Sequence, residues 1–241
     1  MKKTILTISD GNGADNDFKK WPFYLQLLTN KTSRVINPSI TGSSNEMMFM
    51  LLCEVLSKET IDYCIIQWSY PNRLDVVAND FWVEQAKKDS IYHFNLINNN
   101  NKQWWISSAS DNEYIKKYHD CYIQSWQATQ RSQAWIMAAA ELLKFHNVKF
   151  VFSLCYSMDF LDPTKNILNS YPWVWHEKNQ GISEFRNISQ FKDFDKGLPQ
   201  PHTLIHLDWI DKVLKPNCEF VNYTDTVYNT VEQSLLKLCL K

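Results

Sequence analysis

Short apolar runs alternate with longer amphipathic stretches along most of the chain. The apolar runs are bounded by turn residues and carry no polar alternation, which is typical of strands buried on both faces. We predict strands at residues 4–9, 35–36, 61–68, 148–154 and 220–221. Between them, apolar residues recurring at three- and four-residue steps predict helices at 22–28, 46–57, 113–145, 204–214 and 226–240.

This alternation predicts an α/β fold, a three-layer α/β/α sandwich around a mainly parallel sheet with its first strand central. Two insertions interrupt the pattern. We expect residues 74–110 to be irregular, with an asparagine-rich loop tip at 98–101, and residues 157–200 to be a long excursion with short helices. Neither stretch suggests a domain boundary. We therefore expect one domain over residues 1–241.

Composition and charge narrow the classes of partner. The net charge of -1 gives no support to a nucleic-acid partner. The six cysteines are widely spread without a Cys-x-x-Cys pair, which predicts reduced thiols in a cytoplasmic protein. No apolar segment has the ~18 residues of a membrane span, so no membrane partner is expected. No cofactor is expected either, and the absence of a glycine-rich nucleotide motif disfavours a flavodoxin-like nucleotide binder.

Turn residues follow the predicted strands directly. The chain has only 5 glycines, and three of them lie in such turns, at Gly11, Gly13 and Gly42. Because ligands of parallel α/β sheets bind outside the carboxyl ends of the strands, we expect these turns to share one rim. The rim residues expected from the sequence are Ser9, Asp10, Gly11, Gly42, Asn45, Ser69 and Arg73.

These blocks, in this order, resemble the SGNH (GDSL) hydrolase superfamily, in particular divergent members from bacteriophages and marine bacteria. The resemblance places Ile8-Ser9-Asp10-Gly11 at the block that holds the family's serine nucleophile, and Gly42 at the glycine of the oxyanion hole. Residues 66–73, with the pattern Trp-Ser-x-Pro-x-Arg, stand at the third block, and residues 199–206 at the last. The resemblance implies a flavodoxin-like sheet and an ester-hydrolase ancestry.

The departures from the family pattern concern the catalytic set. In strict register Gly11 stands where the nucleophile belongs, and Ser69 where the family has an oxyanion-hole asparagine. Gln67 replaces the glycine of the third block, and Gln200 falls at the catalytic histidine. No aspartate lies three residues before His202 or His206.

Several candidate residues keep two interpretations. Ser9 is a nucleophile only if the turn shifts by two residues and His202 or His206 acts as its base; otherwise its hydroxyl bonds to backbone. Asp10 is a catalytic-block residue or a turn-stabilising carboxylate. The two histidines lie four residues apart, as a metal pair would, but no third ligand is evident. Arg73 binds an anionic group or braces its loop through Asp75 or Asp80.

Two functions follow from these observations. The first is an SGNH-like protein without catalysis, a binding or structural module that serves as a carbohydrate-binding protein or as a component of a bacteriophage virion. The alternative is a serine esterase acting on O-acetyl groups of glycans or on small acyl esters. The candidate partners are a carbohydrate or acyl-ester ligand, virion proteins, and a second copy of the chain.

Overall fold

The fold is taken from a computed structural model of the chain. The residues that it describes are 2–10, 20–29, 32–40, 42–71, 73, 75–78, 93–98, 101–107, 117, 125–155, 160–174, 181–195 and 202–239. For 75–78, 93–98 and 101–107 the description is of the backbone.

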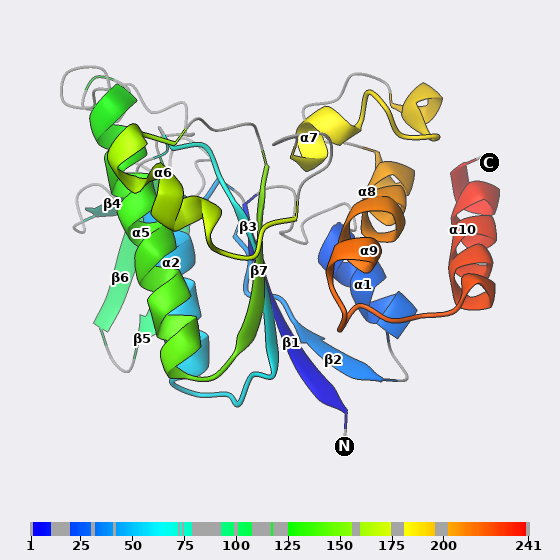
Figure 1. Ribbon diagram of the computed structural model, residues 1–241, viewed down its shortest axis with the longest axis horizontal. Helices are drawn as coiled ribbons and strands as arrows, with labels where there is room; N and C mark the ends of the chain where they lie inside the picture. The colour runs from blue at the N-terminus through cyan, green and yellow to red at the C-terminus, as the bar shows by residue number, and fades with distance from the viewer. Residues whose placement is uncertain are drawn as a thin grey trace.

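A four-stranded parallel sheet forms the centre of the protein (Figure 1). Its strand order is β2-β1-β3-β7, so β1 lies inside the sheet as the sequence predicts. This is the order with which a flavodoxin-like sheet begins. The strands are β1 (Lys3–Ser9), β2 (Ser33–Ile36), β3 (Tyr63–Trp68) and β7 (Lys149–Leu154).

Helices cover both faces of this sheet, which confirms the three-layer sandwich (Figure 1). One face carries α2 (Asn45–Leu56) and α5 (Ser125–Phe145), with α6 (Asp162–Asn169) packed on α5. The other face carries α1 (Trp21–Thr29), α8 (Thr203–Trp209), η2 (Ile210–Leu214), α9 (Lys215–Asn217) and α10 (Asp225–Cys239). Two short helical segments, α7 (Ile182–Phe185) and η1 (Lys192–Phe194), precede α8.

Alternation along the strands divides the core in two. Leu6 and Ile8 of β1 point into the core beneath α2 and α5, whereas Ile5 points into the core beneath α1 and α8. All three side chains are fully buried. Burial of apolar side chains at about 25 cal/mol per Å² is the main force that fixes the strands between the two helical layers. The strand ends are thereby held rigidly at one edge of the sheet.

The stretch 74–110 differs from the expectation. It contains a second, antiparallel sheet of order β4-β6-β5, made by β4 (Asp75–Ala78), β5 (His93–Asn98) and β6 (Asn101–Ser107). The predicted irregular structure is therefore wrong for these residues. The signal was a hairpin pattern: two runs with aromatic and β-branched residues lie on either side of an asparagine run, and Asn98 pairs with Asn101.

The outer edge of β7 carries one more strand position. Trp173 forms an isolated parallel bridge with Phe152, in which Phe152 N–H donates to the Pro172 carbonyl at 2.8 Å. The strand predicted at 220–221 is absent: Phe220 lies in a turn and stacks on Tyr63, and Val221 has no regular secondary structure. Among the described residues, no helix combines the length and apolarity needed to cross a bilayer.

Candidate functional site

Asp10, the residue directly after β1, is the centre of a polar cluster at the carboxyl edge of the sheet. Its side chain is 2% exposed, and three side chains donate hydrogen bonds to it. Oδ2 accepts from Ser69 Oγ at 3.1 Å and from Arg73 Nη1 at 2.6 Å, while Oδ1 accepts from Cys155 Sγ at 3.0 Å. A buried carboxylate is costly unless it is paired and hydrogen-bonded, and here both conditions are met.

The segment after β3 reaches Asp10 because α2 holds it in place. The Asn45 side chain accepts from Ser69 N–H at 2.8 Å and donates to the Ser69 carbonyl at 3.2 Å. Asn45 is itself fixed at the start of α2, where Ser44 caps the helix by accepting from Met47 N–H at 3.3 Å. The start of α2 and the end of β3 are thus joined by a two-bond clamp.

Gly42 leads into this clamp with a φ of 82°, in the left-handed region that favours glycine. Gly42 lies three residues before Asn45 in the chain. The structure brings together Asp10, Asn45, Ser69 and Arg73 through the hydrogen bonds above, with Gly42 close to them in the chain. Gly11 and Gln200 lie outside the described residues.

Ser9 points away from the solvent, into the core beneath α1 and α8. Its side chain is fully buried, and its hydroxyl donates to Gln67 Oε1 at 2.9 Å. The indole N–H of Trp21 donates to the same oxygen at 3.2 Å. Because an indole N–H can only donate, Trp21 fixes the orientation of the Gln67 amide, with its oxygen toward Ser9. Ser9 therefore faces an amide oxygen, which cannot remove its proton.

The two histidines stand elsewhere. His202 caps α8: its Nδ1 accepts from Leu204 N–H at 3.3 Å, and its ring stacks on Phe194. His206 is fully buried within α8. The side-chain partners of the Ser9 hydroxyl in the described part of the chain are Gln67 and Cys155, and neither is a histidine.

No group of three or more metal-binding side chains occurs among the described residues. The pairing of His202 with His206 in a metal site, considered from their spacing, thus finds no third ligand in that part of the chain.

Cys155 is a site residue that sequence reasoning missed. It follows β7, is fully buried, and contacts Asp10, with Ser9 Oγ 4.0 Å away. Its position is set by the backbone: Cys155 N–H donates to the Trp68 carbonyl at 2.8 Å, and its own carbonyl accepts from Ser183 N–H at 3.3 Å. Its position after a predicted strand, at the same edge as Asp10, was the available signal.

Arg73 supplies the positive charge of the cluster. Its ion pair in the described part of the chain is with Asp10. Of the two aspartates expected to brace Arg73, Asp80 lies outside the described residues and Asp75 is described by its backbone alone. The Arg73 side chain is 22% exposed, and the backbone N–H of Arg73 donates to the Tyr70 carbonyl at 3.2 Å. Tyr70 is exposed at the same loop. The cluster can therefore offer an ordered cation and an aromatic ring to a ligand.

Comparison with known proteins gives distant similarity only. No protein-family model matches the chain, and no curated protein matches its sequence. Among solved structures, TesA has a TM-score of 0.38 at 10% identity, covering 99% of this chain and 98% of its own. A candidate acylhydrolase from Bacteroides fragilis NCTC 9343 has a TM-score of 0.39 at 11% identity, covering 98% and 88%. A mutant of the esterase AlinE4 has a TM-score of 0.35 at 11% identity, covering 99% and 95%. With TM-scores below 0.5, these similarities decide neither the family nor the chemistry of the site.

Proposed function

We propose that this chain is an SGNH-hydrolase-like protein that binds a carbohydrate at the carboxyl edge of its sheet and does not hydrolyse it. The observation that carries the proposal is the environment of Ser9. An activated serine needs a base within hydrogen-bond distance and access to the substrate. Ser9 has an amide oxygen as its hydrogen-bond acceptor and is fully buried.

The aspartate of the turn supports the same conclusion. In a serine hydrolase the third group orients the base, but the Asp10 carboxylate is occupied by Ser69, Arg73 and Cys155. These bonds tie the ends of β1, β3 and β7 together. They make a rigid rim rather than a proton-transfer chain.

A carbohydrate is the ligand class that fits the exposed part of the rim. Sugars are bound by planar polar side chains beside an aromatic ring, and Arg73 and Tyr70 lie together in the loop after β3. Rigid positioning lowers the entropic cost of binding, and the Asp10 bonds supply it. The resemblance to bacteriophage proteins makes a virion the setting proposed for this binding.

The experiment uses an O-acetylated polysaccharide, acetylated xylan, as the probe. Affinity electrophoresis measures retardation of the native chain in a gel containing the xylan, and acetate release is measured in parallel. We expect retardation with no release of acetate. Tyr70→Ala removes the aromatic ring and is expected to abolish the retardation.

The matched control is Ser57→Ala, at the far end of α2, where the serine hydroxyl donates to the Glu54 carbonyl on the surface. This variant is expected to be retarded like the native chain. Release of acetate by the native chain, or unretarded migration of the native chain, contradicts the proposal.

A further inference from the structure

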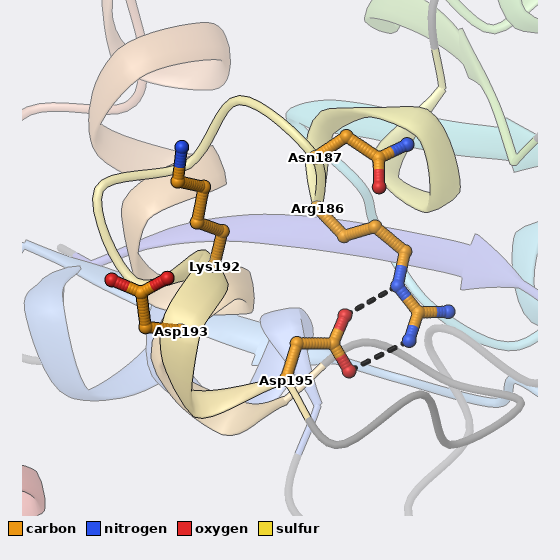
Figure 2. A pocket seen from close by; sticks show the side chains of 5 residues that line it. All are labelled: Arg186, Asn187, Lys192, Asp193 and Asp195. Atoms are coloured by element: carbon orange, nitrogen blue, oxygen red, sulfur yellow. Dashed lines mark hydrogen bonds and ion pairs between the residues drawn. The ribbon is translucent and has the colours of Figure 1, made fainter.

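Two arginines of this protein are held by carboxylates with little exposure, but in different ways. Arg186 directs Nε and Nη2 toward the two oxygens of Asp195, so the fork of its guanidinium is filled (Figure 2). Arg73 contacts Asp10 through Nη1 alone, at 2.6 Å from Oδ2. Both donor positions of the Arg186 fork are therefore paired with Asp195, whereas Arg73 pairs with Asp10 through one nitrogen only.

The open edge of Arg73 follows from how Asp10 is shared. Oδ2 of Asp10 also accepts from Ser69, and Oδ1 accepts from Cys155, so Arg73 shares the carboxylate with two other donors and contacts it through one nitrogen. In the described part of the chain, Asp10 is the only acceptor for the Arg73 guanidinium. The Arg73 side chain is 22% exposed, and its Nε and Nη2 have no hydrogen-bond partner among the described residues.

The surroundings of Arg73 include the N-terminus of a helix and a second arginine. The start of α2 is clamped to Ser69, and a helix N-terminus carries partial positive charge. Helix α5 abuts the loop, since Ser132 Oγ donates to the Pro71 carbonyl at 3.3 Å. The neighbouring Arg131 interacts electrostatically with Glu46 in the first turn of α2, and its buried Nη2 has no hydrogen-bond partner in the described part of the chain.

We infer that Arg73 binds an oxyanion, a carboxylate or a phosphate, carried by the ligand of the rim. The inference rests on the proposed binding function and adds the chemical class of the ligand: an acidic saccharide in preference to a neutral one. A guanidinium fork matches two oxygens of a carboxylate or phosphate with parallel charge-assisted hydrogen bonds. Asp10 holds the guanidinium in place for this contact. Tyr70, in the same loop, offers its ring to the sugar.

The test is an NMR titration that follows the Nε–H signal of Arg73, assigned through its loss in Arg73→Lys. The probes are glucuronate, glucose 6-phosphate and neutral glucose. We expect the two acidic sugars to shift this signal and to bind about tenfold more tightly than glucose. The comparison between glucuronate and glucose 6-phosphate distinguishes a carboxylate from a phosphate ligand.

Two variants separate the open arginine from a general charge effect. Arg73→Lys keeps a cation beside Asp10 but removes the fork, and we expect the preference for acidic sugars to fall about tenfold. Arg186→Lys makes the same change where Asp195 fills the fork, and we expect native affinities. Arg73→Gln is expected to lose the preference entirely; if Asp10 without its cation unfolds the chain, the lysine variant decides alone.

The outcomes distinguish this inference from the proposed function. Equal binding of glucuronate and glucose, unchanged by Arg73→Lys, overturns the inference while the carbohydrate-binding function stands. An equal loss of affinity in Arg73→Lys and Arg186→Lys also overturns it. Failure of all three sugars, together with unretarded migration in acetylated xylan, overturns both.

Discussion

Cys155 and Asp10 lie 145 positions apart in the sequence, yet Cys155 Sγ stands 3.0 Å from Asp10 Oδ1. The contact links the ends of β1 and β7, which are not neighbours because β3 runs between them. It closes the ring of donors around a carboxylate that also receives Ser69 and Arg73. The rim is therefore held by side chains from three strand ends, and its stability should depend on each.

Removal of the thiol is expected to destabilise the fold. Cys155→Ala removes the thiol donor from Asp10 Oδ1, and the loss of a partner from a buried acceptor costs about 1–3 kcal/mol. We expect the free energy of unfolding, measured by urea denaturation, to fall by about 2 kcal/mol. Cys155→Ser keeps a donor and should restore part of it. Cys53→Ala, at a half-buried thiol of α2, is the control and should lose less. Equal losses at the two cysteines argue against the Asp10 contact.

The segment that follows β7 is pressed against the strand at Gly181. A Cβ at this position would lie 2.2 Å from the Leu154 carbonyl oxygen and 2.4 Å from the Cys155 carbonyl carbon. Because these are backbone atoms, they cannot turn aside. Gly181→Ala is expected to lower the free energy of unfolding by about 3 kcal/mol.

The comparison for Gly181 is Gly42→Ala, which meets strain from its φ of 82°. That strain costs about 1–2 kcal/mol, so the loss at Gly42 should be smaller. Urea denaturation of both variants measures the two losses. A Gly181→Ala protein as stable as the native chain contradicts the close approach to β7.

Two carboxylates should make stability depend on pH in opposite directions. Burial raises the pKa of Asp208 above its ordinary 3.8. Its favourable contribution to stability is therefore present below pH 3.8 and is lost as the pH rises through its folded pKa. The Thr4 N–H, and then Lys3, lower the pKa of Asp62. The contribution of Asp62 is therefore present above pH 3.8 and is lost as the pH falls through its folded pKa.

The variants Asp208→Asn and Asp62→Asn remove these two dependences separately. Between about pH 3 and pH 7, Asp208→Asn should gain stability relative to the native chain as the pH rises, whereas Asp62→Asn should lose it. Urea denaturation across this range gives both differences. Two differences that change in the same direction contradict the assignment.

Much of the fold follows from local sequence. The apolar run in β1 predicted a central strand, and the apolar repeat over 46–57 predicted α2, because both patterns act over a few residues. The antiparallel sheet in 74–110 was missed because the residues outside the hairpin carry no clear strand pattern.

The site was predictable only as a set of turns. That Asp10 meets Ser69 and Arg73 followed from their places after parallel strands, but the role of Cys155 depended on which strand ends come together. The hydrogen-bond partner of Ser9 depends on Trp21 of α1, whose indole N–H orients the Gln67 amide. A contact between residues so far apart in the chain cannot be predicted from the spacing of residues in the sequence.

The central claim is that Ser9, hydrogen-bonded to Gln67, is not a nucleophile, and ester hydrolysis tests it most directly. The measurement is release of p-nitrophenol from p-nitrophenyl acetate by the native chain, Ser9→Ala and His202→Ala. An enzyme using the two residues together requires losses on the order of 10³-fold in each variant. We predict the same background rate in all three proteins. Rapid turnover by the native chain that Ser9→Ala abolishes would contradict the claim.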